Sequence, residues 1–132
     1  MPIDQSLKGR VFPPTAPYAV TEEKIRKFAT STGGSYAGGP APATFPIVLA
    51  FEAMNAFLDA EQVDLFRIVH GEQRFSYQRP IRPGDVLTAR LTVESLRQIG
   101  GADIIGTASE VTDQSGAAVC TGYATLVHRG EE

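Results

Sequence analysis

The sequence predicts an α+β domain in which one antiparallel sheet wraps around a single long helix. Two observations predict this arrangement. The segment 46–60 is apolar around nearly the whole helical circumference, yet it is too short to cross a bilayer, so it belongs inside the protein. The hydrophobic period then changes from helical to alternating, over four segments joined by tight turns. Because 46–60 is the one helix apolar enough to fill a concave sheet, we expect the sheet to curve around it.

The first thirty residues contain little that can enter a core. Residues 1–17 are rich in proline and are expected to be extended, because Pro13, Pro14 and Pro17 exclude a helix there. Residues 18–20 form a short edge strand in this prediction. Thr21 is expected to cap a short helix that ends near Ala29, with two glutamates in its first turn.

A glycine- and proline-rich loop separates this short helix from the long one. Residues 30–43 read TSTGGSYAGGPAPA, a composition typical of a loop without core residues except Tyr36. Thr44 is predicted to cap the long helix, with Pro46 in its first turn, where proline is tolerated. We expect the helix 46–60 to be buried on all sides.

Four strands complete the predicted domain, which takes in the whole chain, 1–132, as one unit. They are joined by a Pro-Gly turn of type II at 82–85, a Gly-Gly hairpin at 100–101 and a polar turn at 113–116. Consecutive hairpins predict a meander, and a curved sheet around one helix is the hot-dog architecture. Such a sheet leaves an edge exposed, so we expect pairing with a second hot-dog. The expected strands are 66–79, 86–98, 102–112 and 117–128.

Composition excludes several classes of function. A net charge of −3 with scattered lysines and arginines gives no field that would attract nucleic acid. Cys120 is the only cysteine, which excludes an internal disulfide and cysteine-based metal sites, and it is expected to be a small buried residue. No metal and no cofactor is expected. The N-terminus lacks a signal peptide and no apolar run could span a membrane, so a cytoplasmic location is predicted.

Several motifs together resemble those of a known family. The run VHGEQRFSYQRPIRPGDVL, residues 69–87, is similar to the HGEQ…RP…GD signature of MaoC-like dehydratases, and specifically of their N-terminal-type domains. The segments GRVFPP, VTEEKIRKFA and PATFPIVL fit the same pattern, so the resemblance extends from about Gly9 to Val127. It implies a hot-dog fold, acyl thioesters of coenzyme A or acyl carrier protein as substrates, and reversible removal of water from a (3R)-3-hydroxyacyl chain.

The chain departs from this family where the chemistry should be. Catalytic members carry an Asp and a His just before the central helix, where a base and an acid are needed to remove water. Here that segment is STGGSYAGGPAPAT, without Asp, His or Glu and about ten residues shorter than usual. The resemblance therefore implies a non-catalytic half, which would bind the acyl chain and pair, as a homodimer or a heterodimer, with a subunit bearing the Asp and His.

The candidate binding residues lie on the long helix and on the first long strand. Glu72 is predicted on the same strand face as His70, and Gln73 on the opposite face. The residues expected to contact an acyl chain or thioester are Phe51, Met54, Phe57, Leu58, His70 and Gln73. No catalytic residue is assigned, and two alternatives stay open. One is a self-sufficient homodimeric hydratase or thioesterase that uses His70 or Glu52; the other is an acyl- or lipid-binding module without catalysis.

Other polar residues receive structural interpretations. Asp85 is expected to bind backbone N–H groups of its turn, and His128 to be solvated near the C-terminus. Tyr36 is expected to fill space left by the short loop. Four arginines are candidates for attracting an acidic carrier protein or a phosphate group, namely Arg74, Arg79, Arg82 and Arg90.

Overall fold

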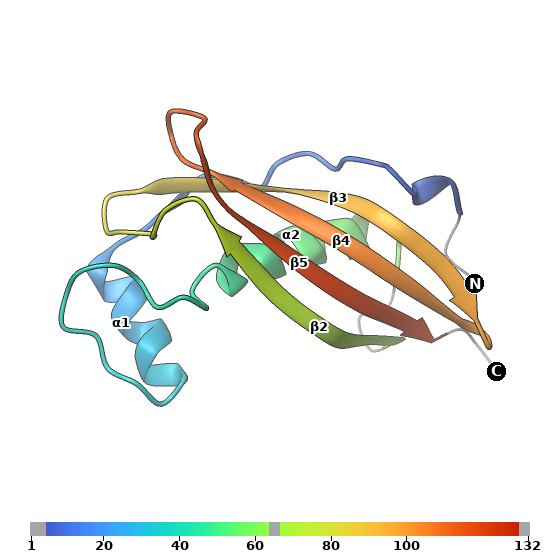
Figure 1. Ribbon diagram of the computed structural model, residues 1–132, viewed down its shortest axis with the longest axis horizontal. Coiled ribbons are helices and arrows are strands. Elements are labelled where there is room, and N and C mark those ends of the chain that lie inside the picture. The colour runs from blue at the N-terminus through green and yellow to red at the C-terminus, as the bar shows by residue number, and fades with distance from the viewer. Residues whose placement is uncertain (1–4, 64–66, 130–132) are drawn as a thin grey trace.

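A long helix lies along the concave side of a curved five-stranded sheet (Figure 1). The computed structural model describes residues 5–63 and 67–129. Within them the elements follow the order expected from the sequence, apart from one turn of 3-10 helix inside the N-terminal segment. They are η1 (Gln5–Leu7), β1 (Tyr18–Ala19), α1 (Glu22–Ser31), α2 (Ile47–Ala60), β2 (Ile68–Tyr77), β3 (Val86–Ile99), β4 (Ala102–Thr112) and β5 (Ala118–Arg129).

The order of the strands corrects the predicted meander. The sheet runs β1-β3-β4-β5-β2, so β2 pairs with β5 and not with β3, its successor in the chain. The connection from β2 to β3 crosses the end of the sheet, with Ile81 buried in the core and Pro80 and Pro83 on either side of it. The predicted type II turn closes it, since Gly84 has a φ of 98° and Asp85 N–H donates to the Arg82 carbonyl. The predicted strand start at Phe66 lies outside the described residues.

The N-terminal segment covers one edge of the sheet. Phe12 N–H donates to the Leu91 carbonyl and Thr15 N–H to the Ala89 carbonyl, both on β3. A bridge joins Val11 to Thr92, and β1 continues the pairing along the same strand. The outer edge of β3 is therefore occupied by the chain itself, whereas β2 forms the opposite edge of the sheet.

The cap of α1 is as predicted. The Thr21 side-chain oxygen accepts a hydrogen bond from Lys24 N–H at 3.1 Å. The helix continues to Ser31, two residues beyond the expected end, and buries Ile25 and Ala29 against the core. Its other face is exposed.

One face of α2 is buried and the other is not, which corrects the expectation of a helix buried on all sides. The helix packs mainly on β3 and β4, and Phe57 is fully buried in edge-to-face contact with Phe12 at 5.0 Å. Phe51 is 45% exposed and Glu52 is also exposed. A single sheet can cover only one side of a helix, so the second apolar side is left for another surface.

Candidate functional site

The segment that leads into α2 contains no group that can transfer a proton near neutral pH. Residues 32–46 carry no acidic side chain, no basic side chain and no histidine. Tyr36 is half-buried against the core, and its hydroxyl donates to the Gly39 carbonyl at 2.6 Å, as expected for a residue that fills space.

The backbone N–H groups at the start of α2 are also occupied. The N–H groups of Ile47, Val48 and Leu49 donate to the carbonyls of the tight turns at 44–46 that precede the helix. Thr44 does not cap the helix, contrary to the prediction: Pro46 is the N-cap residue, and no side chain bonds to the first turn. Free N–H groups at a helix N-terminus can polarise a carbonyl. The donors of this turn already bind the chain's own carbonyls.

A surface hollow of about 400 Å³ lies beside this end of α2. The Tyr77 hydroxyl donates to the Ala43 carbonyl at 2.5 Å and so ties β2 to the loop before the helix. Burial raises the pKa of Tyr77, so the phenol stays protonated and remains a donor. The hollow is lined by Ala41, Ala43, Tyr77, Gln78, Arg79 and Pro80.

A bulge in β2 changes which of its side chains share a face. The register shifts between His70 and Glu72, because Gly71 is an extra residue opposite β5. As a result His70 Nε2 donates to Gln73 Oε1 at 3.0 Å, while Glu72 accepts a hydrogen bond from the Thr125 hydroxyl. The predicted grouping of His70 with Glu72 is therefore wrong, because simple alternation does not hold across a bulge.

The regrouped side chains line the concave side of the sheet beside α2. The His70 ring meets Phe51 of α2 edge to face at 5.9 Å. Gln73 and Phe75 lie over Gly122 of β5, where a Cβ atom would come within 3.0 Å of the Phe75 ring. We name this surface the open concave face; it comprises His70, Gln73, Phe75 and Tyr77 of β2 with Gly122 and Ala124 of β5.

Gln73 has an unsatisfied donor on this face. Its amide nitrogen is buried and finds no hydrogen-bond partner among residues 5–63 and 67–129, although its oxygen accepts from His70. A buried donor without a partner costs about 1–3 kcal/mol. An acceptor supplied from outside this chain would remove that cost.

The predicted binding residues on α2 separate into two groups. Phe57 and Leu58 are fully buried and Met54 nearly so, all within the hydrophobic core. Phe51 alone reaches the open concave face, through its contact with His70. Glu52 is exposed, and its charge, after burial, is the second cause that raises the pKa of Tyr18. A role for Met54, Phe57 and Leu58 in binding an acyl chain stays a prediction.

The Arg-Pro…Gly-Asp part of the motif forms a structural network. Arg79 binds Asp85 through both guanidinium nitrogens, at 2.9 and 3.1 Å, and binds Asp113 at 3.0 Å. Asp85 also accepts the Arg82 N–H, which confirms its predicted turn contact. Arg79 is thus committed to two carboxylates and is not available to a carrier. Of the other arginines, Arg74 stacks on the Tyr123 ring at 4.1 Å.

The prediction that His128 is solvated is wrong. His128 Nδ1 lies 3.3 Å from Asp103 Oδ2, and both side chains are about 5% exposed or less. Alternation along each strand could have found this pair, since Asp103 shares a face with Ile105, and His128 with Leu126. The pair sits far from the start of α2: His128 is roughly 25 Å along an extended strand from Cys120, the partner of Tyr77.

Neither Cys120 nor a metal-binding cluster gives the described residues a catalytic group. Cys120 is buried, and burial raises its pKa to about 11, so its thiol is a poor nucleophile near pH 7. In the described part of the chain no cluster of His, Cys, Asp and Glu could hold a metal ion. The described helices include none with the length and hydropathy needed to cross a membrane.

Comparisons with known proteins place this geometry among dehydratases. The family model described as FAS1-like, dehydratase domain region, matches residues 6–122. A UPF0336 protein of Streptomyces coelicolor is 41% identical over an alignment that covers this whole chain and 99% of the relative. That alignment spans 148 positions, more than the 132 residues here, so the relative contains residues without a counterpart in this chain.

Two solved structures have the same fold. A chain of the truncated HadBC complex of Mycobacterium tuberculosis, a (3R)-hydroxyacyl-ACP dehydratase, aligns with a TM-score of 0.81 and 28% identity. The match covers 96% of this chain and 99% of that one, and it confirms the hot-dog fold predicted from the sequence. A MaoC-like dehydratase aligns with a TM-score of 0.79 and 26% identity, but this chain covers only 43% of it.

Proposed function

The chain belongs to the family of FAS1-like dehydratase domain regions, of the MaoC-like hot-dog type, and from that premise we propose that it is the acyl-binding, non-catalytic subunit of a (3R)-3-hydroxyacyl-thioester dehydratase. In this role it pairs with a second hot-dog that bears an Asp and a His. The two chains together bind the substrate, and the chemistry occurs in the partner.

The observation that carries the proposal is the segment before α2. Dehydration removes a proton from C2 and expels the C3 hydroxyl as water, so a base must accept one proton and an acid must donate another. Residues 32–46 offer neither group, and the N–H donors of Ile47, Val48 and Leu49 are already bonded within the chain. In this proposal, both the proton transfer and the polarisation of the carbonyl come from another polypeptide.

An Asp–His pair does exist in this chain, but its position does not suit the reaction. Asp103 and His128 lie at the opposite end of the sheet from Tyr77, and both side chains are buried. A substrate that approaches the start of α2 does not meet them. We treat this pair as a structural contact between β4 and β5.

The open concave face is the part of this chain that we assign to the substrate and to the partner. It joins an exposed aromatic ring, Phe51, to the free edge strand β2, which also exposes Val69 and Tyr77. A free edge strand can add a strand from a second sheet. The similar mycobacterial chain comes from a complex, HadBC, which supports pairing with a partner subunit in this case.

Purification and a hydration assay test the proposal. The tagged chain should co-purify with a hot-dog protein that carries the Asp and His, and the pair should hydrate crotonyl-coenzyme A while the isolated chain does not. His70→Ala in the pair should keep most of the turnover, because His70 lies on the binding face and not at the reacting atoms. Turnover by the pure isolated chain, and its loss on His70→Ala or Glu52→Gln, would instead assign catalysis to this polypeptide.

A further inference from the structure

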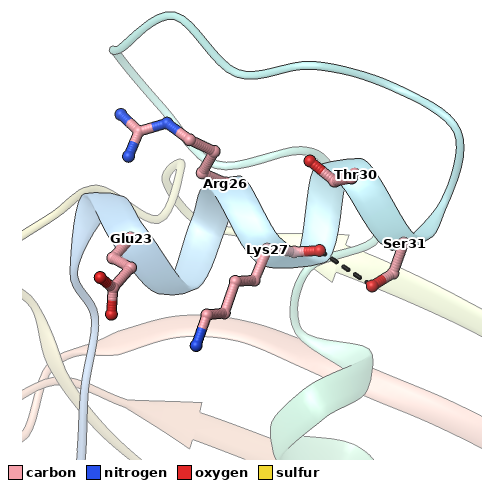
Figure 2. A pocket seen from close by; sticks show the side chains of 5 residues that line it. All are labelled: Glu23, Arg26, Lys27, Thr30 and Ser31. Carbon is pink, nitrogen blue, oxygen red and sulfur yellow. Dashed lines mark hydrogen bonds between the residues drawn. The ribbon is translucent and has the colours of Figure 1, made fainter.

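The exposed side of α1 carries a hollow of about 480 Å³, but its side chains do not converge on a ligand (Figure 2). Arg26 and Lys27 extend to opposite sides of the helix, and Glu23 lines the same hollow. The Ser31 hydroxyl already donates to the Lys27 carbonyl at 2.9 Å. The outer edge of β2 differs from this hollow, because its backbone presents donors and acceptors at a fixed spacing.

Alternation along β2 decides which of its backbone groups point outward. Gln78 N–H donates to the Val119 carbonyl at 2.8 Å and continues the register between β2 and β5. Neighbouring residues of an antiparallel strand direct their N–H and C=O groups to opposite sides. The backbone groups of Gln73 and Phe75 therefore point away from β5, where the described chain places no strand.

Two opposite charges flank Gln73 on the convex side of this strand. Glu72 accepts a hydrogen bond from the Thr125 hydroxyl at 3.4 Å, and the Arg74 guanidinium stacks on the Tyr123 ring at 4.1 Å. Both charged side chains are exposed, and neither forms an ion pair within residues 5–63 and 67–129. Contacts with β5 thus orient the two charges and leave both without a counter-charge.

These charges select one register for a second β2 strand. When a two-fold axis relates two antiparallel strands, the residue on the axis lies opposite its own copy. An axis at Glu72 or at Arg74 places like charges opposite each other, which is destabilising, and an axis at Phe75 gives neither charge a partner. An axis at Gln73 places Glu72 of each chain opposite Arg74 of the other, so two ion pairs form.

We propose that β2 pairs with a second copy of itself about an axis at Gln73 and forms a homodimer with one continuous sheet. Phe51 is 45% exposed and lies beside the same edge, through its ring contact with His70, so its burial adds to the pairing. A short strand pair with exposed ion pairs implies a dissociation constant on the order of 10 µM. The chain is therefore a monomer with an open β2 edge when it is dilute.

The homodimer occupies the edge that the catalytic partner needs. Each chain therefore leaves its copy before it joins the hot-dog that bears the Asp and His, and the homodimer is a resting form without turnover. This consequence rests on the proposed function, whereas the homodimer itself does not.

Charge exchange at positions 72 and 74 tests the register. Sedimentation velocity should show a wild-type dimer at about 100 µM, and E72R or R74E alone should raise the dissociation constant about tenfold or more, because like charges then face each other. An equimolar mixture of the two variants should form a mixed dimer, and the double variant E72R/R74E should dimerise like the wild type. The controls E94R and R97E make the same changes in net charge at exposed positions of β3 and should leave the dimer intact.

A cysteine on the axis provides a second measurement. Q73C should form a disulfide with its own copy under mild oxidation, because the two Cα atoms of such a pair lie about 5.5 Å apart. S76C should not cross-link, since two copies of a residue three positions from the axis lie roughly 20 Å apart. The native Cys120 is buried and does not interfere.

Several results would overturn the assignment. A wild-type monomer at about 100 µM without a Q73C cross-link would exclude the homodimer. Wild-type affinity in E72R or R74E, or no mixed dimer from the two, would exclude this register, and equal losses in the controls would show a general effect of charge. A homodimer that persists when the catalytic hot-dog is added would contradict the competition, while the charge-exchange results would still decide the homodimer.

Discussion

Arg79 holds together two turns that are far apart in the sequence. Its guanidinium binds Asp85 in the β2–β3 connection and Asp113 in the turn between β4 and β5. These hydrogen bonds are charge-assisted and partly shielded from solvent, which makes them stronger than surface contacts. The family motif therefore contributes to folding at this position.

Removal of Arg79 should destabilise the fold without changing its shape. Arg79→Gln leaves two carboxylates facing each other without a cation, and we expect the free energy of unfolding to fall by about 1–2 kcal/mol, a value reduced because the side chain is a third exposed. Urea titration measures the loss. Arg97→Gln, at an exposed position without an ion-pair partner in the described chain, should change it by less than about 0.5 kcal/mol. Equal effects would show that the network contributes nothing specific.

Asp113 should make the stability depend on pH in acid. Hydrogen bonds from the Ser115 hydroxyl and from Arg79 hold the pKa of Asp113 well below its usual range. A carboxyl with a lowered folded pKa stabilises the protein above its unfolded pKa, near 4, and this contribution is lost as the pH falls further. Asp113→Asn should therefore be less stable than the wild type at pH 7, and the gap should narrow below about pH 4. Denaturant titrations at pH 7 and pH 3 test this, and a constant gap would contradict it.

At the scale of elements, the exposed face of α2 should serve association and not folding. Phe51→Asp places a charge on a side chain that is 45% exposed, so the isolated chain should keep its stability within about 1 kcal/mol. Co-purification with the catalytic hot-dog should nevertheless be lost, because a buried unpaired charge at an interface is costly. Ile99→Asp is the matched control, since Ile99 is 57% exposed at the far hairpin. Retained association in the Phe51 variant would exclude this face from the interface.

The N-terminal segment should contribute more to stability than its irregular sequence implies. Phe12 is buried against Phe57, so Phe12→Ala should cost about 3 kcal/mol. The neighbouring Val11 is 54% exposed, and Val11→Ala should cost less than about 0.5 kcal/mol. Thermal unfolding of both variants measures the difference. Similar melting temperatures would show that the segment is not part of the core.

Short sequence patterns predicted the helices, strands and turns, but they did not predict which strands pair in the sheet. The cap at Thr21 and the turn at Gly84 depend on neighbouring residues alone, and both were predicted from the sequence. β2 lies at the far edge of the sheet because it pairs with β5, and the order of the strands in the sequence does not indicate this pairing.

In the candidate site too, the sequence predicted individual residues but not how the folded sheet groups them. The sequence singled out His70 and Gln73, but the bulge at Gly71 decided that they share a face. Glycine in a strand is a recognised sign of a bulge, although it does not say where the register shifts. Thr44 failed as a cap because the turn before the helix already supplies the first carbonyls.

At the scale of the whole molecule, the two edges of the sheet should differ in hydrogen exchange. Among residues 5–63 and 67–129 no strand lies beside the outward amides of β2, so they should exchange quickly in the isolated chain and become protected in the complex. Amides of β3 that face the N-terminal segment should be protected in both states, because Arg10, Phe12 and β1 already lie beside that strand. Mass spectrometry of exchanged peptides measures this. An unprotected β2 in the complex would place the partner elsewhere.

The coverage of β3 by residues 9–19 also limits what this protein can build. A flat sheet with two unpaired edge strands can extend without limit, because each added copy presents another unpaired edge. With a single free edge, pairing through β2 would leave no edge for a further chain, so assembly by strand addition would stop at two chains. Pro13, Pro14 and Pro17 have no backbone N–H, so the segment that covers β3 offers few hydrogen-bond donors to a further strand on that side.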